Sequence, residues 1–193
     1  MLRKLYDRLL ALAATRHAPL ALGAISFAES SFFPLPPDVL LIPMVIAKRS
    51  AWFLYALICT LASVLGAYFG YAIGALLFQT IGQSILEFYG ATDTFARFVV
   101  WYDQWGGWGI FLGALTPFPY KVLTIFSGTV GFGLLPFTLV SIIGRGLRFF
   151  LVSFLLYHFG PPIRDFIEKR LGLMLILFTL LLVGGFIAAK TLF

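Results

Sequence analysis

The chain has 193 residues, of which 61% are hydrophobic and only 11% charged, and its mean hydropathy is +0.98. These values exclude an ordinary soluble domain and indicate an integral membrane protein. The net charge of +6 does not indicate nucleic-acid binding, because the basic residues stand in small groups beside apolar segments. We expect one membrane domain over 1–193, since each spanning helix takes about 20 residues.

The first segment, 1–17, combines basic residues with leucines at helical spacing. Asp7 and Arg8 interrupt what would be the apolar core of a signal peptide. We therefore predict an amphipathic interfacial helix that lies on the cytoplasmic surface.

The next segment, 18–47, is apolar but is broken in its middle by a proline cluster. Each limb then has about 14 residues, and about 21 Å of helix cannot cross a hydrocarbon core of about 30 Å. We predict a re-entrant hairpin that enters the membrane and returns to the same side. Its turn contains Pro34, Pro36 and Pro37.

The segment 51–79 is long enough to span the bilayer as a helix. Gly66, Gly70 and Gly74 recur every fourth residue along it, so they share one face. Small residues at this spacing allow two helices to approach closely. We predict that this face packs against the other half of the protein.

The region 81–105 is more polar and is predicted to lie along the outer interface, with aromatic and apolar residues on one helical face. The segment 107–133 is again apolar with prolines in its middle, here Pro117 and Pro119. The same length calculation predicts a second re-entrant hairpin.

Two further segments, 134–159 and 171–193, are long enough to span, which gives about three transmembrane helices in total. The motifs "PLPPD" and "PFPYK" each precede a spanning helix that contains glycine and an aromatic residue. A hairpin plus one crossing reverses the direction of the chain. The second copy is therefore expected to be inverted relative to the first, as in many secondary transporters.

Lys and Arg favour the cytoplasmic side of short loops. Basic residues occur before residue 18, after 47 and after 159, whereas 81–105 has an excess of acidic residues. This distribution predicts a cytoplasmic N-terminus. The fold expected is thus an all-α integral membrane protein built from an inverted repeat of two re-entrant helical hairpins, about three transmembrane helices and interfacial amphipathic helices.

Five ionisable residues fall within the apolar segments: Glu29, Asp38, Lys121, Arg145 and Arg148. Each costs about 2.5 to 3.5 kcal/mol at the centre of a membrane helix on insertion scales. Glu29 and Lys121 oppose their local helix dipoles and need partners on other helices, whereas Asp38 is placed to cap a first turn. Arg145 and Arg148 are three residues apart and share a helix face.

Two interpretations of these charges remain open. In the first, the carboxylates form structural ion pairs with the cations and hold the two repeats together. In the second, Lys121, Arg145 and Arg148 bind an anionic headgroup in a midplane cavity, and Glu29 and Asp38 couple transport to protons. Phosphate suits the second interpretation, because guanidinium groups and half-helix N-termini both bind it.

Catalytic motifs are not found. The sequence has no nucleophile elbow, no HExxH motif and no Walker lysine in its glycine-rich "FSGTVGFG", so no enzyme activity and no cofactor are expected. The two histidines and single cysteine show no metal-binding spacing, and no metal is expected.

The stretches "FAESSFFPLPPDVLL", "GAYFGYAIG" and "LTPFPYKVLTIFSGTVG" closely resemble the DedA superfamily, also called the VTT or SNARE-associated domain, and its YqaA-like branch. The resemblance covers about residues 18–160. It implies opposing re-entrant hairpins and spanning helices, and members of this family are implicated in moving phospholipids or undecaprenyl phosphate, with bacterial members linked to the proton gradient.

Under this resemblance, Glu29 matches the first acidic position of the family and Asp38 the second. Many members have a second hairpin similar to G-R-F-x-P-x-x-R, but this chain reads "GALTPFPYK". Ala114 then stands at the first arginine position and Lys121 near the second. We infer that Arg145 and Arg148, one helix later, supply the missing charge.

The expected function is a transporter or flippase of the bacterial inner membrane that moves an anionic, phosphate-bearing lipid with proton coupling. Its partners would be membrane lipids and protons, with no nucleic acid, and self-association is left open. The alternatives are a proton-coupled ion or small-solute transporter, a membrane lipid-phosphate enzyme, and a structural or assembly factor.

Overall fold

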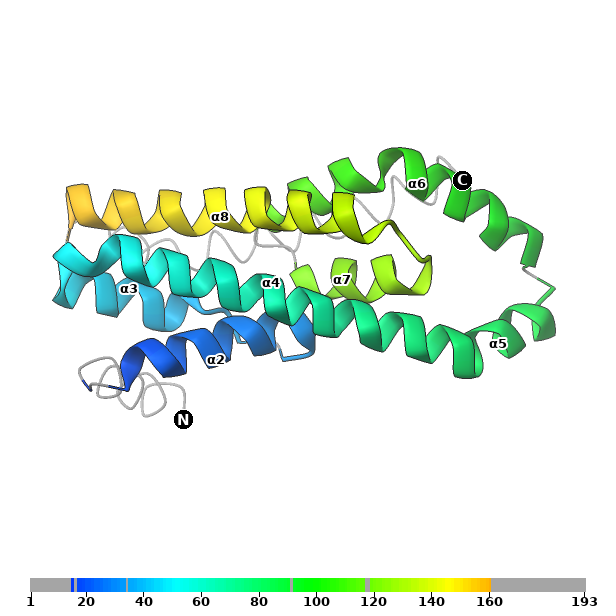
Figure 1. Ribbon diagram of the computed structural model, residues 1–193, viewed down its shortest axis with the longest axis horizontal. Coiled ribbons are helices and arrows are strands. Elements are labelled where there is room, and N and C mark those ends of the chain that lie inside the picture. The colour runs from blue at the N-terminus through cyan, green and yellow to red at the C-terminus, as the bar shows by residue number, and fades with distance from the viewer. Residues whose placement is uncertain (1–14, 16, 34, 91, 117–118, 161–193) are drawn as a thin grey trace, which may run out of the picture.

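The computed structural model describes residues 15, 17–33, 35–90, 92–116 and 119–160, and this part of the chain forms helices and turns with no strand (Figure 1). The predicted interfacial helix 1–17, apart from Thr15 and His17, and the predicted spanning helix 171–193 lie outside the described residues. The helices are α2 (Ala18–Ser31), α3 (Asp38–Ala47), η1 (Arg49–Ala51), α4 (Trp52–Leu77), η2 (Phe78–Gly82), α5 (Gln83–Phe88), α6 (Thr92–Leu115), α7 (Tyr120–Thr129) and α8 (Leu134–Phe159).

Three of the four helices that flank the proline clusters are short. α2 has 14 residues, and α3 and α7 have 10 each. At 1.5 Å per residue they reach about 21 Å and 15 Å, less than the thickness of a hydrocarbon core. α2, α3 and α7 are thus as short as the predicted limbs, whereas α6 before the second proline cluster has 24 residues and is longer than predicted. The re-entry of these helices into a bilayer stays a prediction.

The first long helix extends beyond the predicted span 51–79. Helical backbone continues from Arg49 to Phe88, a run of 40 residues, or about 60 Å if straight. Its regular pattern changes at the π-helical turn Phe78–Gly82, and α5 bends away from the axis of α4 beyond that turn (Figure 1). A bilayer core of about 30 Å can contain only about half of this run along its normal, so part of the run would lie outside the hydrocarbon.

The predicted boundary between the outer region 81–105 and the second hairpin lies inside a continuous helix. α6 runs without a break through Gly106 and Gly107 to Leu115. Each glycine costs a helix only about 1 kcal/mol relative to alanine, and Gly106 packs so closely on the Tyr102 ring that a methyl group would be 2.6 Å from it. Beyond the glycine pair, Ile110, Gly113 and Ala114 are buried, and α6 packs against α8, which supports the helix on the far side of the glycines.

The second long helix matches its prediction. α8 begins at Leu134 and ends at Phe159, the predicted 134–159. It follows a tight turn from α7 in which Gly131 has a φ of 67°, a left-handed conformation that favours glycine.

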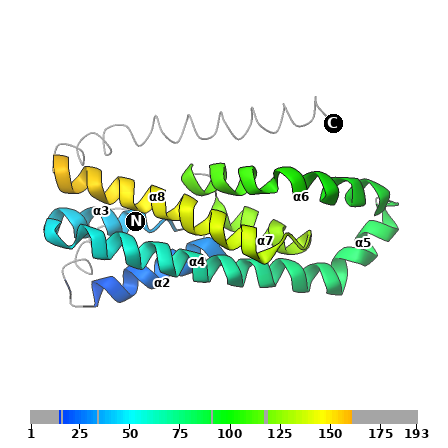
Figure 2. The same ribbon diagram turned by 45° about the horizontal axis from the view of Figure 1, so that its top comes forward.

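The two pairs of helices that flank the proline clusters open toward opposite ends of the molecule. Figure 1 shows that α2 and α3 meet near the middle and open toward the end where α4 begins and α8 ends. α6 and α7 also meet near the middle but open toward the other end, and Figure 2 shows the same arrangement. This arrangement is compatible with the expected inverted repeat, which remains a prediction.

The glycine face of α4 lies at the contact between these two pairs, because α4 packs against both α2 and α7. A Cβ atom added at Gly66 would overlap the Phe27 carbonyl of α2, and one at Gly74 would overlap the Ile125 carbonyl of α7. A Cβ at Gly70 would meet Thr124 of α7 and lie 3.1 Å from the Ser30 carbonyl of α2. The spacing of these glycines therefore allows backbones to touch.

The outer surface of α4 and α8 is strongly apolar. Leu61 and Leu65 on α4 and Leu147 and Leu151 on α8 are each more than half exposed. The run Arg49–Phe88 and the helix Leu134–Phe159 are both long and apolar enough to cross a membrane. An apolar surface of this extent is expected where a protein faces lipid.

Replacing Gly74 by alanine should destabilise the protein by about 1 to 3 kcal/mol, because the added methyl group forces α4 away from α7. Gly107→Ala is the matched control, since a Cβ there meets nothing within 4 Å and should stabilise α6 by up to about 1 kcal/mol. Thermal unfolding of the purified chain in detergent measures both. Equal melting temperatures for the two variants would contradict the close packing at Gly74.

Candidate functional site

Four of the five predicted intramembrane charges meet near the middle of the molecule. α8 supplies Arg145 and Arg148, which lie one helical turn apart on the face turned to α2 and α3. Arg145 pairs with Glu29 near the end of α2, and Arg148 pairs with Asp38 at the start of α3. The two arginines thus hold both limbs of the first hairpin against α8.

Arg145 is completely buried, and its Nη2 atom lies 2.5 Å from Glu29 Oε2. Its guanidinium carbon also lies 5.0 Å from the centre of the Tyr120 ring and 4.6 Å from that of Phe149. Both distances fall within the range of cation–π contact. The buried cation is therefore compensated by one carboxylate and two aromatic faces.

Two serines complete the surroundings of this pair. Arg145 Nε donates to Ser63 Oγ on α4 at 2.6 Å, and Ser63 Oγ lies 2.6 Å from Ser30 Oγ on α2. Ser30 in turn donates to Glu29 at 3.2 Å. These bonds form a closed ring that joins α2, α4 and α8 through polar atoms, so a shift of one of these helices would disturb the contacts of the other two.

Arg148 differs from Arg145 in exposure and in partners. Its side chain is 15% exposed and that of Asp38 is 21% exposed. Its Nη2 atom lies 2.5 Å from Asp38 Oδ2, and its Nη1 atom donates to the Thr116 carbonyl at 3.2 Å. Since Asp38 begins α3 and Thr116 follows α6, one guanidinium connects the inner ends of the two hairpins.

Lys121 occupies the second position of α7 and is half-buried. Its neighbour Tyr120 contacts Arg145, yet the Lys121 ammonium forms no ion pair with any residue that the structure describes. The structure therefore does not join Lys121 to the paired charges.

The charges in this region do not balance. The two ion pairs are neutral together, and Lys121, which the structure does not join to them, adds one positive charge among the five residues. Within the described residues, Arg145 Nη1 is also a buried donor without a hydrogen-bond partner. An unpaired buried donor is costly, and the Tyr120 and Phe149 rings lie against this guanidinium.

The prolines lie at the inner ends of the hairpins. Pro37 precedes α3 and Pro119 precedes α7, each at the position before the first helical residue. Pro36 lies one residue earlier and is exposed. Pro34 and Pro117 fall outside the described residues.

Sequence reasoning identified the charges but not the polar groups that surround them. Ser63 lies three residues before Gly66, so it continues the glycine face of α4 by one turn, and that periodicity was the available signal. Tyr120 lies within the "PFPYK" motif, but nothing in the sequence indicates which cation its ring contacts. In the ranges with described coordinates, no cluster of His, Cys, Asp or Glu is arranged to hold a metal ion.

These features define a helical membrane protein with a charged, largely buried site between broken helices. Residues 35–158 match the VTT domain. The chain therefore belongs to the VTT domain family, also known as the DedA or SNARE-associated family, as its sequence motifs predict.

The curated relatives are of unknown function. A protein of Haemophilus influenzae is 36% identical over 149 residues, which cover 77% of each chain. A protein of Histophilus somni is 38% identical over 151 residues, which cover 78% of each chain. Both are described as uncharacterized, and no solved structure shows a significant match.

Removing the Glu29 carboxylate should destabilise the fold strongly. Glu29→Ala leaves the Arg145 cation buried without its carboxylate, and breaking a buried pair in this way typically costs about 3 to 5 kcal/mol. The double variant Glu29→Ala, Arg145→Met should recover part of that loss, because no buried charge remains. Thermal unfolding in detergent of the two single variants and the double variant gives the coupling energy. Additive losses would contradict the pairing.

Proposed function

We propose that this protein moves an anionic, phosphate-bearing lipid, a phospholipid or undecaprenyl phosphate, across the bacterial inner membrane. Membership of the VTT domain family supports a transporter-like role in a membrane. The specific substrate rests on the chemistry of the five charges. Guanidinium and ammonium groups in a region of low dielectric favour a phosphate oxyanion over a neutral headgroup.

The observation that carries this proposal is the position of Arg148. It connects the inner ends of both hairpins and is the more exposed of the two arginines. A phosphate that reaches it can replace the Asp38 carboxylate as the anionic partner, because both groups offer anionic oxygens to a guanidinium. Replacement would loosen the contact between the hairpins at the point where a headgroup must pass.

Arg145 and Lys121 have different roles in this proposal. Arg145 is buried and paired with Glu29. In this proposal it binds the headgroup only after Glu29 is protonated, because the Arg145 guanidinium then has no counter-ion. Lys121, which has no ion pair in the described part of the chain, supplies the positive charge that attracts the headgroup. Protonation of Glu29 thereby changes the net charge around Arg145, and release of Asp38 from Arg148 accompanies binding of the substrate.

In this proposal, the two hairpins open in turn and let the headgroup reach the site from one side of the membrane and leave on the other. Each would enter the membrane from its own side, with the N-terminus in the cytoplasm, so their inner ends meet near the middle of the bilayer. Broken helices that meet at this depth are a common construction of transport sites. The acyl chains can stay in lipid while only the headgroup crosses.

We assign the chain no enzymatic step. Its site contains cations, carboxylates and serines that bond to one another, which suits binding of a phosphate group. The alternatives remain distinguishable by experiment. A proton-coupled ion or solute transporter would show flux independent of the lipid, and a lipid-phosphate enzyme would release phosphate.

Transport should depend on Lys121 and Arg148. In liposomes that contain the full chain and a labelled anionic phospholipid, Lys121→Gln and Arg148→Gln should each slow headgroup translocation by about tenfold or more, the effect of losing at least 1.4 kcal/mol of binding. Arg97→Gln is the control, since Arg97 is an exposed cation on α6 away from the site. Equal rates in all three variants would overturn the proposed roles, as would equal rates for a neutral lipid.

The orientation can be tested by labelling. Ser50 lies in η1 just before α4, and Thr92 is the first residue of α6, just after α5. Both are exposed, whereas the single native Cys59 is buried. In intact cells, Ser50→Cys should resist a membrane-impermeant thiol reagent and Thr92→Cys should react with it. The opposite pattern would place the N-terminus outside.

A further inference from the structure

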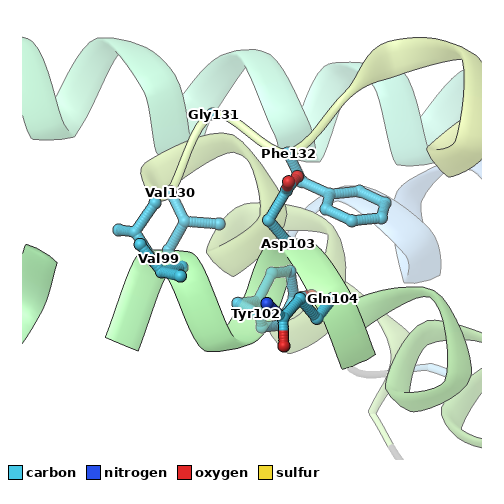
Figure 3. Close-up of a pocket in the computed structure, with 8 residues that line it drawn as sticks. Val99, Tyr102, Asp103, Gln104, Val130, Gly131 and Phe132 are labelled. Atoms are coloured by element: carbon cyan, nitrogen blue, oxygen red, sulfur yellow. The ribbon is translucent and has the colours of Figure 1, made fainter. Parts of the chain in front are cut away.

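A cavity of about 250 Å³ opens between α6 and the turn that joins α7 to α8 (Figure 3). Figure 3 shows the Asp103 side chain extending from α6 toward that turn. The walls of the cavity carry Val99, Val100, Asp103 and Gln104 from α6 and Val130 and Gly131 from the turn. The lining that the structure describes includes none of the five charges of the central site, so the cavity is a separate feature of the molecule.

Ser127 of α7 holds the two walls together. Its Oγ atom lies 3.0 Å from the Tyr102 hydroxyl of α6, and its carbonyl accepts a hydrogen bond from the Phe132 N–H of the turn at 2.9 Å. The Phe132 carbonyl in turn accepts a hydrogen bond from the Tyr71 hydroxyl of α4 at 2.7 Å. Tyr102 and Phe132 both line the cavity and are almost completely buried. The walls are thus fixed before any ligand binds, which lowers the ordering cost of binding.

Asp103 is the charged group of the described cavity lining. Its side chain is exposed, and it forms no ion pair with any residue that the structure describes. Gln104 adds an amide oxygen, which also accepts hydrogen bonds. A negative charge with a second acceptor beside it favours a cation that donates hydrogen bonds.

The rest of the lining indicates which kind of cation fits. Ca²⁺ takes about six to eight oxygen ligands, whereas the lining side chains offer the Asp103 carboxylate, the Gln104 amide and a Tyr102 hydroxyl that already contacts Ser127. The three valines provide apolar contacts for methylene or methyl groups. The cavity is also smaller than the pockets of about 300 to 1,000 Å³ that hold drug-sized ligands. A small organic ammonium group, with its charge at Asp103 and its carbon atoms against the valines, matches these features.

The surroundings of the cavity place it at the depth of lipid headgroups. Trp101 and Trp105 flank Asp103 in the chain and are exposed, and tryptophan is enriched at membrane–water interfaces. The turn lies at the start of α8, whereas η1, with its basic residue Arg49, contacts the other end of that helix. In the predicted orientation the cavity therefore faces the outer leaflet.

We propose that this cavity binds the ammonium group of a small organic amine, with Asp103 as its counter-ion. Two sources share this chemistry, namely the headgroup of an ethanolamine phospholipid in the outer leaflet and a free amine in solution. Because the central charges take no part, this inference goes beyond the proposed transport of an anionic lipid and does not depend on it.

The first experiment uses the purified full chain in detergent with free ethanolamine as the probe, and saturation-transfer NMR measures the Kd at constant ionic strength. Asp103→Asn removes the charge with little change of shape and should raise the Kd by about tenfold or more. Asp93→Asn is the matched control, since Asp93 is an exposed acid in the first turn of the same helix. It should bind ethanolamine as wild type does.

A second pair of variants tests the cavity itself. Val100 lines the cavity and is 61% exposed, so Val100→Phe fills the opening without entering the core and should also raise the Kd by about tenfold. Leu112→Phe is its control, because Leu112 is an exposed aliphatic residue of α6 outside the lining. Equal affinities in all four variants would overturn the proposal. So would displacement of ethanolamine by an equal concentration of K⁺, which would show unspecific attraction to a carboxylate.

The lipid arm distinguishes the two sources. Native mass spectrometry of the same chain, with phosphatidylethanolamine or phosphatidylglycerol added at equal concentration, measures the lipid that stays bound. If the source is the headgroup, Asp103→Asn should retain less phosphatidylethanolamine than wild type and an unchanged amount of phosphatidylglycerol. Ethanolamine binding that depends on Asp103, with lipid retention that does not, would assign the site to a free amine. Binding that is independent of Asp103 in both arms would reject the site.

Discussion

The buried ion pair between Arg145 and Glu29 is the interaction on which the rest of the structure depends. Taking both charges out of water is costly, and only close geometry with further hydrogen bonds offsets that cost. Ser63, Ser30 and the aromatic faces around Arg145 provide those contacts. The positions of α2, α4, α7 and α8 are thereby linked, because each helix contributes to the surroundings of one guanidinium.

The pair needs backbones that approach closely, and the glycine face of α4 permits this. Side chains at Gly66 or Gly74 would separate α4 from α2 and α7, and the Ser63 hydroxyl of α4 would then be out of reach of Ser30. The close packing of α4 and the burial of the Arg145–Glu29 pair therefore depend on each other. The Arg148–Asp38 pair lies one turn along α8 from Arg145 and is less buried, which is why the proposed function places the exchange of anions there.

Much of this arrangement follows from the sequence, for specific reasons. The proline clusters limit helix length, and the apolar run 134–159 predicts α8. The pairing of each carboxylate with its own arginine could not be predicted, because it depends on the rotation of α8 relative to two separate limbs. The continuity of α6 was not predicted because the glycines at 106 and 107 suggested a helix end, whereas their cost of about 1 kcal/mol each is small beside the packing of α6 against α8.

The two ion pairs join residues that are 116 and 110 positions apart in the chain. At about 5 to 20 residues per second, the ribosome completes Glu29 and Asp38 about 6 to 23 s before their arginines exist. During that interval the first hairpin has no internal counter-ion. Its carboxyl groups must therefore be protonated, stay in the interface or be shielded by the insertion machinery, and α8 completes the assembly when it arrives.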